Sequence, residues 1–370
     1  GFVGGNALAY QWYVLGTSGT WAAISDTGVY TGANSQTLNI SDVAGLNQYQ
    51  YYCQVRENTA TCYTATQATQ VKEAQNTWSN GWSNGIPVLG SKVIIAGSYD
   101  TETNGPLDVC ELTVNSNASV RVKSNFPLIV KKKITNLGTT ADNFVVESDA
   151  NLIQQDNVTN TGKIKVERNV LDMNNVTGQI DYVYWSSPVS GQVIKGALGF
   201  SPNTPANGYL QYNEINDKFV VTSDPSFLTG KGYAIRAESG TNGYNKVYSF
   251  TGTPNNGNIQ YQSLRFTDAA HGFNLVGNPY PSNIDFNKLH AMNSSNIYST
   301  AWFWTNNSYT AGQVGSGYSG NNYAMFNGTG GSPATSNPSN PFNNSMTPDG
   351  KIKVGQAFIV QNKQQENSNS

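Results

Sequence analysis

Residues 181–362 present the same order of segments twice, and a repeat of this size restricts the fold before any single residue is considered. Each pass has an aromatic or apolar strand that ends at a proline, an aromatic strand around a polar turn, and a glycine–aromatic strand. The first pass comprises DYVYWSSPVSG (181–191), GYLQYNEINDKFVV (208–221) and LTGKGYAIRA (228–237), and the second comprises FNLVGNPYPSNI (273–284), TAWFWTNNSYT (300–310) and IKVGQAFIVQ (352–361). The pattern predicts a β-sandwich over 181–370, with copies at 181–237 and 273–361. Neither copy holds a recognisable set of catalytic groups, which favours a structural or contact surface over an active site.

The composition favours strands throughout the chain. Its 370 residues predict about two or three domains. Charged residues make up 12% of the chain, against roughly 25% in typical soluble domains, while 37 Gly and 21 Tyr residues suit strands joined by tight turns. We expect only one short helix, around Asp285–Met292. A net charge of −2 excludes nucleic-acid binding driven by electrostatics, and no apolar stretch is long enough to span a bilayer.

Residues 1–73 carry the pattern of an immunoglobulin-like sandwich. Apolar and polar residues alternate in short segments separated by turns, with Trp12 in an early strand. A later turn precedes Tyr49, Tyr51 and Cys53, which alternate onto one face of a strand. This arrangement predicts a tyrosine corner, in which the Tyr51 hydroxyl finds a backbone partner upstream.

Residues 77–180 form a series of short apolar segments, such as KVIIAGSY (92–99) and CELTVN (110–115), separated by Asn- and Gly-containing turns. Strands this short and regular predict a β-solenoid, in which each coil stacks on the previous one and buries a common inner face. We expect Val122 and Val166 to point into that interior. The predicted chain is therefore all-β: an immunoglobulin-like sandwich, a short β-solenoid and a C-terminal β-sandwich with an internal repeat.

Several segments are also similar to known proteins. YQWYV, WAAISDTGVYTGANSQTLNISDV and NQYQYYCQV closely resemble the immunoglobulin-like modules of secreted Bacteroidota surface proteins. WSNGIP (Trp82–Pro87), CELTV (Cys110–Val114) and DYVYWSSPV (Asp181–Val189) match the region that follows such modules. Those modules usually begin with one or two strands before the YQW strand, and here only Gly1–Asn6 precede it. The resemblance implies that the first domain is incomplete or that its first strands lie outside this sequence.

The resemblance also implies an export route and a location. Proteins of this group are substrates of the type IX secretion system and often end in a β-sandwich sorting domain that attaches them to the cell surface. Nothing after Ile359 looks like such a domain, and the chain ends in the polar segment QNKQQENSNS (361–370), so we expect a longer parent chain. The implied partner is the secretion machinery during export, and the implied location is extracellular or the outer cell surface. The matching motifs are specific for the group and say nothing about an activity.

The best candidate for a metal site is the segment DTETNGPLDVCE. It places oxygen-bearing side chains and a glycine at the positions that an EF-hand loop uses for calcium: Asp100, Glu102, Asn104, Gly105, Asp108 and Glu111. Glu102 is longer than the usual residue at its position, and both flanks have the pattern of strands, not helices. We favour the alternative, a solvated loop between two coils, so no metal ligand is predicted.

Three cysteines occur in the chain. Cys53 and Cys62 flank a turn-rich segment, and they either form a hairpin disulfide or remain two buried thiols. Cys110 alternates with apolar positions, so we expect it in the core.

Basic residues recur at alternate positions of the predicted solenoid. The pairs are Arg121 and Lys123, Lys131 and Lys133, and Lys163 and Lys165. Stacked coils would align them into a cationic ladder for an anionic glycan. Alternatively they are the outward face of each coil, where Lys discourages edge-to-edge pairing, and we favour this second interpretation. A ladder with Arg121, Lys131 and the Asp100 loop would suit a polysaccharide lyase or hydrolase, or a glycan-binding module, acting on the solenoid face.

Aromatic residues gather in a Gly- and Asn-rich region of the second repeat. They are Trp302, Trp304, Tyr309, Tyr318 and Tyr323. Flat rings beside amide side chains hold sugar faces in many proteins. Trp302 and Trp304 lie on one face of a predicted strand, however, and this favours core packing for both.

The sequence supports no particular reaction. Its two histidines, His271 and His290, lack zinc-ligand spacing, and neither a nucleophile elbow nor a P-loop occurs. We therefore predict a non-enzymatic exported surface protein, an adhesin or structural stalk fragment, with no catalytic, cofactor or metal residues. Its contact region is expected in the sandwich, where the long loops of 311–349 can vary without disturbing strands.

Overall fold

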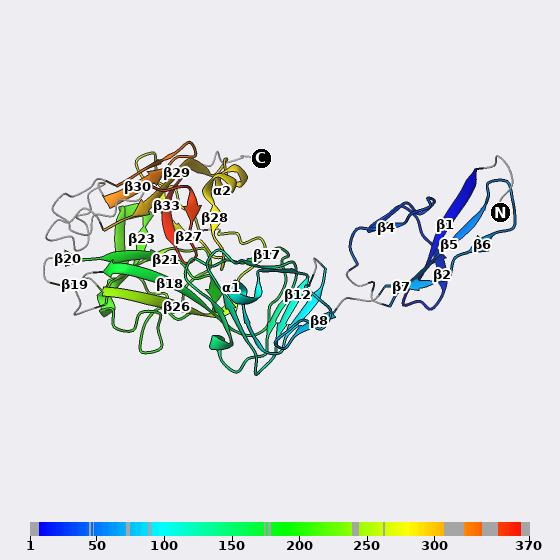
Figure 1. Cartoon of the computed structure of the whole chain (residues 1–370). Coiled ribbons are helices and arrows are strands. Elements are labelled where there is room, and N and C mark those ends of the chain that lie inside the picture. Colours follow the sequence, from blue (N-terminus) through cyan, green and yellow to red (C-terminus); the bar gives the residue numbers. More distant parts are fainter. Residues whose placement is uncertain are drawn as a thin grey trace. The chain divides into compact units, whose positions relative to one another are not determined.

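The computed structural model is nearly all β, with 45% of residues in strands and 7% in helices, which confirms the predicted fold class. Figure 1 shows the strands and the short helices α1 (Thr101–Asn104) and α2 (Phe286–Met292). The chain divides into two compact units, one built mainly from Gly1–Thr77 and the other mainly from Leu112–Ser370. The structure describes residues 7–43, 46, 48–71, 75–87, 90–173, 175–176, 179–238, 244–261, 263–306, 322–334 and 347–363.

The N-terminal module, residues 7–71, is built on one antiparallel sheet. Its strands have the order β2-β1-β5-β6, and β7 also pairs with β5. Alternation along the strands sends Trp12, Val14 and Tyr51 to one face, where they pack with Ile24 and Ala33. A two-stranded ribbon, β3–β4, completes the described strands. The bounds are β1 (Leu8–Leu15), β2 (Trp21–Ala23), β3 (Tyr30–Thr31), β4 (Asn39–Ile40), β5 (Gln50–Glu57), β6 (Thr64–Ala65) and β7 (Thr69–Gln70).

Tyr51 differs from the predicted tyrosine corner. The partner that the structure describes for its hydroxyl is the Tyr30 hydroxyl, 3.0 Å away on β3, and not an upstream backbone group. Burial is the main cause that raises the pKa of Tyr51, and the hydrogen bond to Tyr30 adds to it. A side chain therefore takes the role that a backbone group has in a tyrosine corner, because β3 places Tyr30 within hydrogen-bond distance of Tyr51.

A β-solenoid of about four turns follows, as predicted. Its strands form three sheets with the orders β15-β12-β9-β8, β10-β13-β16-β18 and β11-β14-β17. The bounds are β8 (Gln75–Trp78), β9 (Lys92–Ile95), β10 (Ser98–Asp100), β11 (Leu107–Val109), β12 (Glu111–Val114), β13 (Ser119–Val122), β14 (Leu128–Val130), β15 (Ile134–Asn136), β16 (Phe144–Val146), β17 (Leu152–Gln154) and β18 (Ile164–Met173). Three short strands per coil explain why the sequence shows many turns and no long periodic segment.

The solenoid interior is built from aligned, buried apolar rows. Parallel register places Val120 beside Phe144 and Leu128 beside Leu152 in successive coils. Val122 and Val166 are both completely buried, which confirms their inward orientation. Burial of such rows is the main favourable term that holds a stacked coil to its neighbours.

Strand β18 belongs to two structures at once. On one edge it pairs in parallel with β16, the last full coil strand, through Val145–Lys165 and Val146–Val166. On its other edge it pairs antiparallel with the long strand β26 (Tyr244–Pro254), from Ile164–Gly252 to Met173–Tyr244. Figure 1 shows these two strands side by side. An antiparallel neighbour ends the parallel stack, so β26 closes the edge at which another coil would have to add.

The C-terminal sandwich contains two sheets with the same strand order. The first is β21-β25-β23-β24 and the second is β27-β33-β29-β30, extended by β31, with every neighbouring pair antiparallel. The bounds are β21 (Tyr182–Trp185), β23 (Tyr209–Asn213), β24 (Lys218–Val221), β25 (Tyr233–Arg236), β27 (Phe273–Gly277), β29 (Ile297–Trp304), β30 (Tyr323–Phe326), β31 (Gly331–Ser332) and β33 (Ala357–Asn362). The remaining short elements are α1 (Thr101–Asn104), β19 (Asn175–Val176), β20 (Gln179–Ile180), β22 (Val189–Ser190), β28 (Ile284–Asp285), α2 (Phe286–Met292) and β32 (Lys351–Ile352). The sequence repeat is thus matched by a repeated topology.

The two sheets are related by an approximate twofold axis. The backbone N–H of Ser186, after β21, donates to the carbonyl of Gly355 before β33, and the equivalent N–H of Gly277 donates to the carbonyl of Gly230 before β25. Both distances are 3.0 Å. Such reciprocal bonds are what a twofold contact between two similar units requires.

Small residues permit the close approach at this axis. A Cβ on Gly277 would lie 2.1 Å from the Cβ of Ser186, its equivalent in the other copy. A Cβ on Gly232 would lie 2.8 Å from the Cβ of Ala357, again its equivalent. Each contact therefore pairs a glycine of one copy with a small residue of the other.

Candidate functional site

The outward face of the solenoid carries paired charges and not a cationic ladder. Glu147 Oε1 lies 2.7 Å from Lys123 Nζ and 3.6 Å from the Arg121 guanidinium. Lys165 contacts Asp142 and lies 4.0 Å from Glu167. The hydrogen bond that Lys123 donates to Glu147 is the main cause that raises the pKa of Lys123. Each of these cations already faces a carboxylate, so the face offers little net attraction to an anionic polymer.

Of the other two predicted basic pairs, Lys165 belongs to this sheet, whereas its companion and the pair Lys131 and Lys133 do not. Lys131 and Lys133 lie in the corner between β14 and β15, and Lys163 precedes β18. Within the charged sheet, the row that joins Arg121 to Lys165 passes through Val145, which is buried. The hypothesis of an aligned ladder is therefore wrong for the described strands, because coil corners interrupt the register that it needs.

The Asp100–Glu111 segment folds into a single helical turn followed by strands. Asp100 caps the single-turn helix α1, and its Oδ1 accepts the backbone N–H groups of Glu102 (2.9 Å) and Thr103 (3.3 Å). Glu111 begins β12 and lies 3.4 Å from Lys92 Nζ. Among the described residues, which include this whole segment, no three His, Cys, Asp or Glu side chains are placed to hold a metal ion. The helix cap therefore occupies Asp100 Oδ1, one of the oxygens that the predicted calcium loop would use.

The cysteines and histidines stay apart from one another. Cys53 is buried in the N-terminal module, Cys62 is exposed, and no disulfide joins them. His271 Nδ1 lies 2.7 Å from Asp268 Oδ1, and this hydrogen bond is the first cause that raises the pKa of His271. His290 lies on α2, the short helix expected from the sequence, and stacks on Phe286.

The aromatic residues of the second repeat belong to the interface between the two sheets. Trp302, Trp304 and Tyr323 are partly buried against a core formed from both copies. Tyr323 donates or accepts a 2.7 Å hydrogen bond with Tyr184, and burial raises its pKa to about 12. Packing therefore accounts for these rings, as favoured for the two tryptophans. Tyr309 and Tyr318 lie outside the described residues.

Two aromatic pairs repeat with the approximate twofold axis. Tyr212 and Phe219 face each other across β23–β24 with ring centroids 5.2 Å apart and planes at 70°. Trp304 and Tyr323 occupy the equivalent places across β29–β30, at 5.3 Å and 72°. Tyr184 contacts members of both pairs. Matching geometry at matching positions indicates a structural cluster that both copies need.

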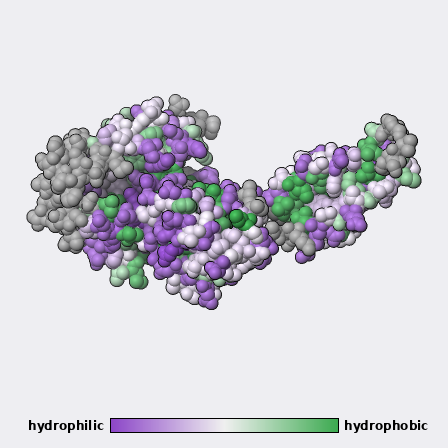
Figure 2. Space-filling view, in the orientation of Figure 1, coloured by the Kyte–Doolittle hydropathy of each residue, from purple (hydrophilic) through white to green (hydrophobic). Residues whose placement is uncertain are grey.

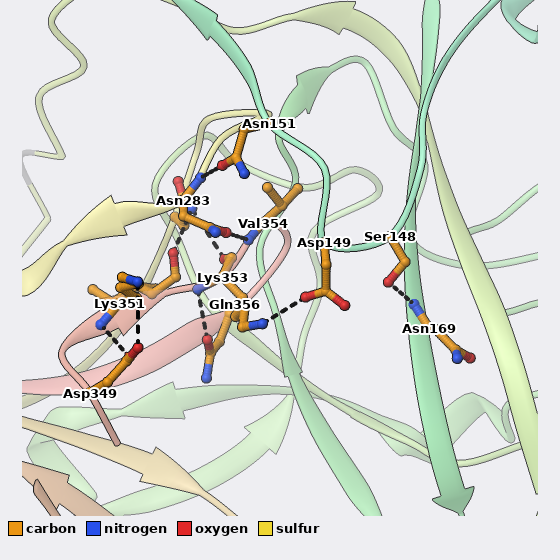
Figure 3. Close-up of polar contacts among 12 residues, drawn as sticks. Ser148, Asp149, Asn151, Asn169, Asn283, Asp349, Lys351, Lys353, Val354 and Gln356 are labelled. Atoms are coloured by element: carbon orange, nitrogen blue, oxygen red, sulfur yellow. Dashed lines mark hydrogen bonds and ion pairs between the residues drawn. The ribbon is translucent and has the colours of Figure 1, made fainter. Parts of the chain in front are cut away.

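A set of polar contacts between distant segments joins the solenoid to the sandwich (Figure 3). The backbone N–H of Asn283 donates to Asn151 Oδ1 (2.8 Å), and Asn283 Oδ1 accepts the N–H of Val354 (3.1 Å). Lys353 Nζ lies 2.7 Å from Asp149 Oδ1. A short coil corner, residues 148–151, therefore contacts two loops of the second copy. We call this set the junction.

Arg168 extends the junction from the shared strand β18. Its Nη1 donates to the carbonyl of Gly355 (3.0 Å), and its guanidinium lies 4.7 Å from the centre of the Trp185 ring. Burial lowers the pKa of Arg168 to about 10, while the nearby charge of Asp149 acts in the opposite direction. The side chain remains a cation at neutral pH, and it contacts both copies of the sandwich.

Residues 65–370 match a family model described as a domain of unknown function (DUF8693). The match covers far more than half of the chain. The chain belongs to the DUF8693 family. A search of curated proteins and a search of solved structures found no match.

The DUF8693 region begins within β6 and contains the solenoid, the sandwich and the junction, while most of the N-terminal sheet precedes it. Among the described residues, no helix of this DUF8693 protein combines the length and the apolar character needed to cross a membrane. Sequence reasoning missed the junction residues Asp149, Asn151, Arg168 and Asn283. The sequence pattern that could have indicated them is weak, because it consists only of polar residues in short turns beside predicted strands.

Proposed function

We propose that this chain is a non-enzymatic scaffold segment of an exported surface protein, an adhesin or stalk that a type IX secretion system carries to the cell surface. The observation that carries the proposal is β18, which completes the solenoid and also pairs with β26 of the sandwich region. A shared strand couples two domains more stiffly than a flexible linker does. Stiff coupling suits a stalk segment that holds a contact surface away from the point where the protein is attached to the cell.

The junction supports the same proposal from side-chain contacts. Asn160 Nδ2 donates to the carbonyl of Pro254 (3.1 Å), and Val158 exchanges two hydrogen bonds with the Asn256 side chain at 2.9 and 3.0 Å. With the Asn151–Asn283 and Asp149–Lys353 contacts, they tie the last coil to three loops of the sandwich region. Polar contacts of this number at a domain boundary resist relative movement.

The surface is consistent with an extracellular scaffold. Figure 2 shows that the visible face of the larger unit is mostly hydrophilic or neutral, with apolar residues in small separate areas. A surface without large contiguous apolar patches limits non-specific association. The export route and the outer-surface location rest on the resemblance of the YQWYV and DYVYWSSPV segments to secreted Bacteroidota proteins.

The test of location uses an antibody against this chain on intact producing cells, before and after protease treatment of the cell surface. We expect a surface signal that protease removes and that a strain without type IX secretion lacks. A signal that stays inside the cell in both strains would contradict the proposal.

The test of chemistry is incubation of the purified chain with neutral and anionic polysaccharides. We expect no new reducing ends and no unsaturated sugars. Turnover that disappears when one or two carboxylates are replaced by amides would establish an enzyme and reject the scaffold.

A further inference from the structure

The outer face of the N-terminal sheet carries aromatic residues that do not serve its core. Trp12, Val14 and Tyr51 point to the packed side, so their strand neighbours Tyr13 and Tyr52 take the opposite face. The register places Tyr13 directly opposite Tyr52. It also places Leu15, on the same face, opposite Trp21 of β2. We name Tyr13, Leu15, Trp21 and Tyr52 the aromatic shelf.

The rings of the shelf are in contact with one another. Tyr13 and Tyr52 stack with centroids 5.1 Å apart and planes within 6°. Trp21 meets Tyr52 edge-to-face, at 4.6 Å and 80°. Trp21 and Tyr52 stand on β2 and β5 with β1 between them, about 9.6 Å apart at ordinary strand spacing. The indole must therefore reach across β1, and 39% of Trp21 remains exposed to solvent.

Amide side chains border the shelf. Gln54 Nε2 donates to the Tyr52 hydroxyl at 3.2 Å. Gln50 stands opposite Leu15 on one side and opposite Gln70 on the other. Within the described strands of this face, the charged residue is Arg56, which lies at the far end opposite Ala9. The shelf and its border are thus apolar rings surrounded by uncharged hydrogen-bonding groups.

We propose that the aromatic shelf binds a neutral polysaccharide. The flat C–H faces of sugar rings stack on aromatic side chains, while their hydroxyls bond to amides, so an uncharged aromatic face with a glutamine border matches this ligand class. The area of the shelf also favours a sugar ligand over a protein partner. Strand spacing gives the shelf an area on the order of 100 Å², whereas a standard protein interface buries about 800 Å² per partner. One or two sugar rings fill such an area, whereas a folded protein partner does not.

This inference gives the proposed surface scaffold a ligand, and it rests on the proposed function only for its biological setting. The ligand site itself depends on the geometry of β1, β2 and β5. The shelf lies in the module that mostly precedes the DUF8693 region. Binding and rigid support are therefore roles of different parts of the chain in this proposal.

The experiment is affinity electrophoresis of the whole chain in native gels that contain xylan, galactomannan or hydroxyethyl cellulose, with polygalacturonate as the anionic comparison. We expect at least one neutral polymer to retard the chain more strongly than polygalacturonate does. Because aromatic anchors dominate contacts of this kind, Trp21→Ala should weaken that retardation by about tenfold. Trp21→Phe should retain part of it.

The matched control is Tyr63→Ala, which removes an aromatic ring that is 58% exposed in the same module but outside the shelf. It should leave the retardation unchanged. All of β2 is exposed, so Trp21→Ala should keep its fold, and equal thermal melting of both variants checks this. Tyr52→Gln supplies a second shelf variant with the same expected loss.

Three outcomes would overturn the proposal: no retardation by any of the neutral polymers, retardation by polygalacturonate alone, or equal retardation of Trp21→Ala and the unchanged chain. None of them affects the scaffold proposal, which stands on surface detection and on the absence of turnover. Conversely, an intracellular location would reject the scaffold and leave a positive shelf result intact.

Discussion

The β-solenoid and the β-sandwich are both built from repeated β units, but their units are related in different ways. Successive solenoid coils are displaced along a stack in parallel register, as in the row Val120–Phe144. The two sandwich copies face each other about an approximate twofold axis, as the reciprocal bonds of Ser186 and Gly277 show. A displaced repeat leaves an unpaired edge at its end, whereas a twofold pair closes on itself. The solenoid therefore needs a cap, and β26 provides it for the sheet that contains β18.

The difference is also visible in the two interiors. The solenoid interior is mainly aliphatic, with residues such as Val122 and Leu128, and its row at Val120 also holds the rings of Tyr99 and Phe144. The sandwich depends on aromatic clusters, in which Tyr184 contacts rings of both copies. Stacked coils of constant width suit small branched side chains, while two sheets about 10 Å apart need larger ones to fill the space.

The largest effect is expected from a charge in the solenoid interior. Val122→Asp and Val166→Asp each place a carboxylate where no water reaches, at a cost of about 4 kcal/mol or more. If β18 unites solenoid and sandwich, both variants should also lose the near-ultraviolet circular dichroism that the sandwich tryptophans give. Arg121→Gln, on the outward face of the same strand as Val122, is the control and should melt like the unchanged chain. Cooperative melting retained by both Asp variants would refute the inward assignment.

The second prediction tests the twofold contact. Gly277→Ala forces a methyl group against Ser186, and overpacking of this kind costs about 1–3 kcal/mol. Adding Ser186→Gly should restore most of the loss, because the two positions are equivalent and only one needs to be small. Denaturant unfolding of the single and double variants measures the recovery. If the double variant is no more stable than Gly277→Ala, the close approach of the two copies is not the cause.

The third prediction concerns the junction. Asn283→Ala removes the acceptor of the Val354 N–H, and we expect a loss of about 1–2 kcal/mol in the free energy of unfolding. Asp349→Ala is the control, since Asp349 and its partner Lys351 are both mostly exposed in the same region. An equal effect of the two substitutions would show that the junction contributes nothing beyond an ordinary surface contact.

The smallest expected effect is a dependence on pH. Glu214 is buried, which by itself raises its pKa, but hydrogen bonds from Thr267 (two of 2.6 Å) and Gly272 (2.8 Å) lower the pKa below its ordinary value. A lowered pKa in the folded state contributes stability above the unfolded value of about 4.3. That stability is lost as pH falls through the folded pKa. Acid unfolding should be less steep in Glu214→Gln than in the unchanged chain, and identical slopes would contradict this role.

The sequence allowed the solenoid to be recognised because each coil must bury the same face, which forces regular short strands such as 119–122. It also marked both sandwich copies, because prolines and aromatic residues recur at equivalent strand ends. The candidate sites were much harder to predict. Spacing alone does not define the partners of a side chain. It does not say whether Asp100 binds calcium or caps a helix, or whether Arg121 contacts a substrate or pairs with Glu147.

The sequence by itself determined the strand content, the stacking of coils and the duplication, since these follow from local alternation and from turn residues. Only the tertiary structure decided that β18 belongs to two domains and that Arg121 and Lys123 are paired with a carboxylate. It also decided that Tyr13, Trp21 and Tyr52 come together on one face. The physical reason is the range of the interactions. Alternation acts between neighbours in the chain, whereas sheet order, charge pairing and ring contacts join residues that only the complete fold brings within reach.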